Sequence, residues 1–192
     1  GAGQGGGAPR APRVLPGTDT VRLETDAVTR ETSVEVRHDP RIPVDRETLA
    51  ARQRALLDLY ALARPLYEAG RAATKADERI QAARKLLDAA EGNDALRAQA
   101  DTLARRLGEV RRKLAEAGRA GRLAAAIEGV SARPTDDQLW QIDEAWRTGP
   151  EAIRSLNEIL TASLPALEAA IYHDAARPRP IEPVAVPGRS VT

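Results

Sequence analysis

Hydrophobic residues recur every three or four positions along most of the chain, which predicts amphipathic helices rather than strands. The clearest repeat runs from Leu96 to Leu114, where apolar residues are spaced by four, three, four, three and four positions. Two apolar positions in every seven are typical of a helix that packs at a shallow angle on a neighbour. We call this set the seam and expect it to be a packing or interaction surface; it comprises Leu96, Ala100, Leu103, Leu107, Val110 and Leu114.

A long helix is predicted before the seam. Asp45 is a suitable N-cap, and the helical pattern continues from there to about residue 90. Pro65 lies inside this span, and we expect a kink there because proline has no backbone N–H to donate. The stretch Glu91–Asp94 should end the helix, since Gly92 suits a C-terminal cap.

Two further helices are predicted after the seam. A break that contains two glycines is followed by a short helical pattern over about residues 122–130. Thr135 and Gln138 then form a capping-box pattern, which marks the start of the last helix. We expect this helix to bend at the Gly149-Pro150 pair and again at Pro165.

A short β unit is predicted ahead of the helices. Residues 20–23 and 32–36 alternate apolar with polar side chains, as the strands of a half-buried hairpin do. A two-stranded hairpin is marginal in water when it stands alone. We therefore expect the hairpin to be the last part of an incomplete Ig-like sandwich. Its apolar face would comprise Val21, Leu23, Val34 and Val36.

These patterns divide the chain into four parts. A flexible Gly- and Pro-rich linker is predicted at 1–13, the β-hairpin at 14–43, the helical bundle at 44–173, and a Pro-rich tail, disordered or extended, at 174–192. The predicted fold class is mainly α, an antiparallel helical bundle preceded by a short β-hairpin. Because the chain begins with Gly, we expect it to be a fragment of a longer protein.

The amino-acid composition excludes several fold classes and several classes of partner. The 192 residues include no Phe, Met or Cys and only 3% aromatic residues, so the core must be built from Ala, Leu, Val and Ile. This excludes an aromatic-rich β-barrel and any disulfide or thiolate metal site. The net charge of +1 gives no field that would attract nucleic acid or an anionic membrane. No apolar run approaches the roughly 20 residues that cross a bilayer.

Candidate chemistry is sparse. His38 and His173 are the only imidazoles, and neither belongs to a cluster of carboxylates with metal-ligand spacing. A basic stretch at 105–113 is interleaved with acidic residues and lacks aromatic stacking partners, as on a solvated helix face. We therefore predict no catalytic residue, cofactor or metal. Trp146 continues the apolar stripe of the last helix, whereas Trp140 lies off it and should cover a helix junction or a partner surface.

The order of several short motifs resembles that of a known family. The motifs are Pro16-Gly17-Thr18, Val21-Arg22-Leu23, Val34-Glu35-Val36-Arg37, Asp39-Pro40-Arg41 and, after a helical segment, Ala132-Arg133-Pro134-Thr135. Over roughly residues 14–172 they resemble the C-terminal region of bacterial sortilin-like, BNR-repeat β-propeller proteins, which carry a glycosyl hydrolase-like or sialidase-like label. The sequence departs from that pattern at Asp19, where the family has an aromatic residue, and in its short connection at 118–121.

The resemblance implies a C-terminal accessory or assembly module without catalytic residues of its own. Such a module would pack on the upstream β-propeller of the parent chain or associate with a second copy of itself. The alternative is a stabilising part of an active glycoside hydrolase whose catalytic propeller lies upstream. The resemblance favours a secreted or periplasmic location, and it implies neither a nucleic acid nor a membrane as partner.

Overall fold

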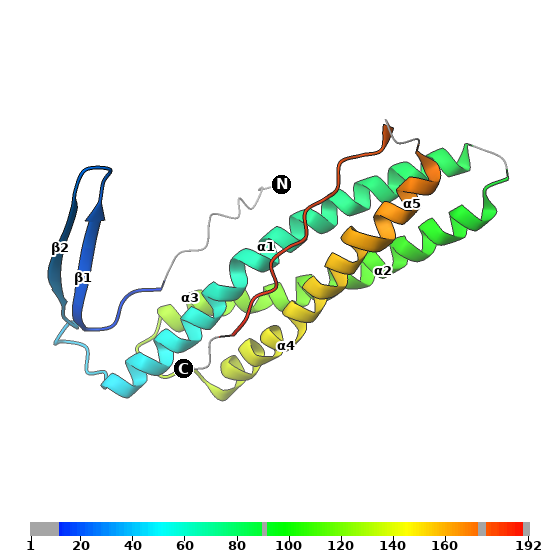
Figure 1. Ribbon diagram of the computed structural model, residues 1–192. Helices are drawn as coiled ribbons and strands as arrows, with labels where there is room; N and C mark the ends of the chain where they lie inside the picture. Colours follow the sequence, from blue (N-terminus) through cyan, green and yellow to red (C-terminus); the bar gives the residue numbers. More distant parts are fainter. Residues whose placement is uncertain (1–11, 90–91, 173–175, 190–192) are drawn as a thin grey trace, which may run out of the picture.

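The structure is a computed structural model that describes residues 12–89, 92–172 and 176–189. A β-hairpin is followed by helices that run up, down and up again as an elongated antiparallel bundle (Figure 1). The predicted fold class, mainly helical with an N-terminal hairpin, is therefore confirmed. Nearly all of the predicted linker at 1–13, together with His173, lies outside the described residues.

The hairpin consists of β1 (Gly17–Glu24) and β2 (Thr29–Val36), paired antiparallel. The turn is closed by Thr25, whose backbone N–H donates to the Val28 carbonyl at 3.0 Å. Val21 lies opposite Thr32, and Val34 lies opposite Asp19, so the apolar side chains of both strands share one face. The two strands therefore have the alternation that the sequence predicts.

Helix α1 (Arg46–Asp88) is a single helix of 43 residues that begins where the sequence predicts. The Asp45 carboxylate accepts a hydrogen bond from the Thr48 N–H at 2.8 Å and caps the first turn. The helix continues through Pro65 without a break, because packing on both sides of the proline holds the backbone helical. Gly92, in the connection to the next helix, takes the left-handed φ of 81° that favours glycine.

Helix α2 (Asp94–Gly118) runs back along α1 and carries the whole seam. It leads through a 3₁₀ turn, η1 (Arg119–Arg122), into the short helix α3 (Leu123–Glu128). Arg52 of α1 donates to the Ile127 carbonyl at 3.1 Å and ties α3 to the start of the first helix. The break and the short helix agree with the glycine-containing interruption expected after the seam.

Helix α4 (Asp136–Glu158) begins with the predicted capping box, formed by Thr135 and Gln138. The bend expected at Gly149-Pro150 does not interrupt this helix. The irregular segment is instead a π-helical turn, η2 (Ile159–Ser163), directly before α5 (Leu164–Ile171). Pro165 has no N–H to donate to the preceding turn, and a wider turn at this point accommodates that loss.

Two clusters of buried aliphatic side chains hold the three long helices together, and Leu66 packs against both. Gly149 allows the close approach at their junction, since a Cβ there would lie 3.3 Å from the Leu66 side chain and 3.5 Å from Ala117. Many of the buried positions are alanines, so the helix backbones approach closely. Fully buried alanines include Ala69, Ala76, Ala83, Ala100 and Ala152.

Residues 176–189 form an extended strap that runs back along the bundle beside α1 and α4 (Figure 1). Val184 is buried with the first cluster, and its backbone pairs with the Asn157 side chain through two hydrogen bonds of 2.8 Å. The sequence left a disordered and an extended tail open, and residues 176–189 are extended along the helices.

The seam generates a direct stability prediction. Replacing Leu107, which is fully buried in α2, with Ala should lower the free energy of unfolding by about 2–5 kcal/mol, because it leaves a cavity. The matched control is Leu86→Ala in α1, where the side chain is 48% exposed and the change should stay within about 0.5 kcal/mol. Chemical denaturation followed by circular dichroism measures both, and equal losses would contradict the assignment of the seam to the core.

Candidate functional site

The seam lies inside the bundle and is not free to bind a partner. Leu103, Leu107, Val110 and Leu114 are each at most 6% exposed, and Leu96 packs at the edge of the same cluster. The seam was expected to be a packing or an interaction surface, and its side chains are buried between the helices. Any interaction surface of this chain must therefore be sought elsewhere.

The two tryptophans have different environments. Trp146 is buried in the second cluster, and within the described part of the chain its indole N–H has no hydrogen-bond partner. Trp140, six residues earlier on α4, is 63% exposed. It borders a shallow depression of about 300 Å³ between α2 and α4, which also contains Glu116, Arg119 and Glu144. Of the two tryptophans, only Trp140 is exposed to solvent while the C-terminal residues 176–189 cover the bundle.

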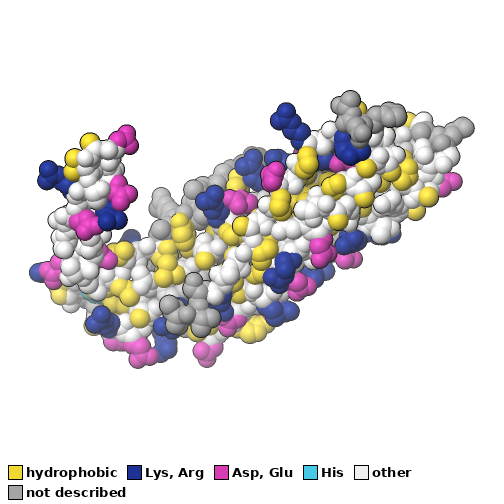
Figure 2. Space-filling model, viewed as in Figure 1, with side chains coloured by type: hydrophobic (Ala, Val, Ile, Leu, Met, Phe, Trp, Pro, Cys, Tyr) yellow, Lys and Arg dark blue, Asp and Glu magenta, His cyan; other side chains and the backbone are white. Residues whose placement is uncertain are grey.

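The hairpin presents an uncovered apolar face. Val21 is 52% exposed, Leu23 is 62% exposed and Val34 is 44% exposed, and the hairpin projects from the bundle as a separate arm (Figure 2). Among the residues that the structure describes, neither a helix nor a third strand packs on this face. The same face also carries Asp19, Arg30 and Thr32, each paired directly with one of these aliphatic residues. The face is therefore mixed, and its uncovered aliphatic side chains are the part that a partner would bury.

The opposite face of the hairpin is polar and paired within itself. Arg22 binds Glu31 across the strands at 2.7 Å, and its guanidinium also lies 3.2 Å from Glu24. At the base of the hairpin Arg37 binds Glu35 at 2.6 Å. This polar face is therefore solvated. A docking partner would meet the other face, which carries Val21, Leu23 and Val34.

A cavity of about 580 Å³, which we call the neck cavity, lies where the hairpin joins the bundle. Its wall is mostly apolar, and the groups that could bind a ligand are few. The cavity could not be predicted from the sequence, because its wall comes from four separate stretches of the chain. No local pattern indicates that these stretches come together. Its lining includes Val36, His38, Asp39, Ile42, Arg52 and Leu56.

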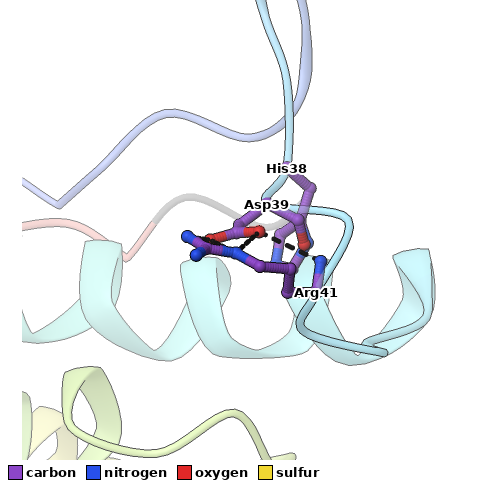
Figure 3. Close-up of polar contacts among 3 residues, drawn as sticks. All are labelled: His38, Asp39 and Arg41. Carbon is purple, nitrogen blue, oxygen red and sulfur yellow. Dashed lines mark hydrogen bonds and ion pairs between the residues drawn. The ribbon is translucent and has the colours of Figure 1, made fainter.

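His38 and Asp39, neighbours in the sequence, do not form an acid–base pair. The Nδ1 of His38 lies 2.9 Å from the Asp39 carbonyl oxygen, which can only accept, so Nδ1 carries the proton. The Asp39 carboxylate faces Arg41, which donates to it from Nε at 3.0 Å and from a terminal nitrogen at 2.7 Å (Figure 3). These hydrogen bonds lower the pKa of Asp39, and the same pairing raises the pKa of Arg41.

The described residues contain no group of three or more His, Asp or Glu side chains placed to hold a metal ion. Over the same ranges, none of the helices combines the length and the apolar character needed to span a bilayer. The chain matches no protein-family model, no curated protein and no solved structure.

The Asp39–Arg41 pair gives a prediction about ionisation. The substitution Arg41→Ala should raise the pKa of Asp39 toward its usual value, because the largest cause of the lowered pKa is the hydrogen bond from the Arg41 side chain. The stability that the pair contributes is therefore present above the unfolded-state pKa of Asp39 and is lost as the pH falls through its folded-state pKa.

Carboxyl chemical shifts followed by NMR during an acid titration measure this change. The matched control is Arg37→Ala, which removes an exposed arginine paired with Glu35 and should leave the Asp39 titration unchanged. An Asp39 titration that is identical in the Arg41→Ala variant and the unsubstituted chain would refute the assignment.

Proposed function

We propose that this chain is a non-catalytic accessory module of a longer protein and that it docks through its hairpin. The apolar face of the hairpin would complete a β-sandwich whose other strands are encoded before Gly1. The resemblance described above suggests that the sandwich adjoins the β-propeller of a BNR-repeat, sortilin-like protein. The bundle would act as a rigid body attached to that assembly.

The exposed apolar face of the hairpin carries this proposal. Removing one Val or Leu side chain fully from water contributes about 1.5–3 kcal/mol. Val21, Leu23 and Val34 lie together on one face, so a covering sheet would gain several kcal/mol. Side chains that alternate along both strands also match the inner face of a sandwich, where two sheets interdigitate.

The seam is buried between α1, α2 and α4 and is not available to a second copy. Leu57, Tyr60 and Tyr67 of α1 are exposed and recur at helical spacing, so they form a second apolar surface on the bundle. Self-association through the hairpin face is the competing way to cover Val21, Leu23 and Val34. A partner sheet in the same protein is favoured because the motifs that carry the resemblance begin at Pro16, within this β unit.

The test compares two substitutions on neighbouring residues of β1. Val21→Asp places a charge on the apolar face, whereas Thr20→Asp places the same charge on the polar face as a matched control. In the longer natural protein, Val21→Asp should release the hairpin, and trypsin should then cleave at Arg22 and Arg30 at least tenfold faster. Thr20→Asp should leave both sites protected. In the present chain alone, neither substitution should change the cleavage rate.

Cleavage is followed by mass spectrometry, with the uncut bundle as an internal reference. Equal protection of the two variants in the longer protein would contradict the proposal. A gene that encodes no β-rich segment before Gly1 would also contradict it. A dimer of the present chain that Val21→Asp dissociates would show that a second copy covers the hairpin instead.

A further inference from the structure

The surface beneath the strap has features of a peptide-binding site. We call it the strap groove and define it by the helix residues that hold the strap, Asp58, Arg79, Asp143, Trp146, Asn157 and Glu168. All of them belong to α1, α4 or α5, so the bundle builds the groove without help from the strap. The strap contacts these residues near its two ends and at its centre.

The central contact recognises backbone rather than side chain. The Asn157 amide donates to the Val184 carbonyl and accepts from the Val184 N–H, both at 2.8 Å. One side chain thus satisfies both polar groups of one peptide residue, as a neighbouring strand would. The Val184 side chain enters the first cluster beside these hydrogen bonds and is 8% exposed.

The contact near residue 179 depends on a buried ion pair. Arg79 of α1 donates to Glu168 of α5 from Nε at 2.6 Å and from a second guanidinium nitrogen. Glu168 is 2% exposed, so this pair is fixed within the bundle. The remaining guanidinium nitrogen of Arg79 donates to the Arg179 carbonyl at 2.9 Å and so binds the strap through its backbone.

The contact at residue 189 recognises a cation. Arg189 donates to Asp58 at 2.6 Å and to Asp143 at 2.7 Å, which places its guanidinium between α1 and α4. It also lies 5.8 Å from the centre of the Trp146 ring, within the range of a cation–π contact. Two carboxylates and one indole ring thus select an arginine five residues after the anchored valine.

Between the contacts at residues 179 and 184, Ile181 packs against the edge of the first cluster and is only partly buried. A cleft of about 810 Å³ separates residues 178–185 from α1, and most strap side chains are exposed. Prolines at 178, 180, 183 and 187 restrict the free segment to extended conformations, which lowers the entropy lost on docking. The strap therefore resembles a short peptide ligand more than a layer of the core.

We propose that the strap groove is a binding site for an extended, proline-containing peptide and that the strap of a second copy of this chain can occupy it. A second copy presents the same valine, the same arginine and the same backbone, so every contact described above can form between molecules. Exchange of identical elements is a low-cost route to association. This inference uses no part of the hairpin and stands independently of the proposed function.

The first test uses the full chain with its own strap released. Val184→Asp with Arg189→Glu alters the strap and leaves every groove residue in place. A fluorescein-labelled peptide with the sequence of residues 176–189 should bind this variant saturably in fluorescence anisotropy. It should bind the unsubstituted chain at least tenfold more weakly, because there the strap occupies the groove. Adding Asn157→Ala to the released variant should weaken peptide binding at least tenfold.

Circular dichroism checks that each variant keeps its helices. Arg189→Glu alone serves as a second released variant, since it places a carboxylate against Asp58 and Asp143 without disturbing the core. Absence of saturable binding to both folded variants would overturn the proposal. Binding that Asn157→Ala leaves unchanged would also overturn it, because the peptide would then lie elsewhere.

The second test detects association between complete chains. A chain with an altered groove, Asn157→Ala with Asp58→Arg, is mixed with the strap-altered chain Val184→Asp with Arg189→Glu. One partner then supplies an intact strap and the other an intact groove. Light scattering should show a complex of twice the 20.6 kDa chain mass only in the mixture. If the mixture shows only the masses of the separate chains, at concentrations where the peptide binds, strap exchange between copies is overturned.

Discussion

Close packing of small and aliphatic side chains between α1, α2 and α4 is the constraint on which the rest of the structure depends. The chain contains no Phe or Met, so large side chains that could fill gaps between distant helices are scarce. Alanines such as Ala69, Ala76 and Ala100 bring the backbones together, and leucines and isoleucines fill the remaining space. Gly149 marks the tightest point, where α4 passes both Leu66 and Ala117. An elongated bundle with a thin core follows from this composition.

This packing determines which surfaces remain for interaction. Because the seam is used inside the bundle, the exposed apolar side chains lie elsewhere. They are found on the hairpin, on α1 and on α4, and include Val21, Leu23, Val34, Leu57, Tyr60, Tyr67 and Trp140. Under the strap, Asn157 and Arg79 bind its backbone, and Glu168 holds the Arg79 guanidinium. The proposed docking through the hairpin and the proposed binding of a strap by the groove use different residues of the chain.

Most of the fold could be predicted from the sequence because its signals are local. The Asp45 cap, the Thr135–Gln138 capping box and the spacing of the seam each lie within a few turns of one helix. The strap could not be predicted in this way, since Asn157 and Val184 are 27 residues apart and Arg189 is 131 residues from Asp58. The neck cavity was missed for the same reason. Pro150 does not interrupt α4, which runs from Asp136 to Glu158.

The bundle buries its own apolar stripes, whereas the hairpin leaves Val21, Leu23 and Val34 in water. Amide hydrogen exchange of the present chain, measured by NMR at single-residue resolution, tests this difference. The account predicts that amides around Leu107 exchange only through global unfolding, whereas amides of β1 and β2 exchange with little protection. Hairpin amides as strongly protected as those of α2, in a monomer, would contradict it.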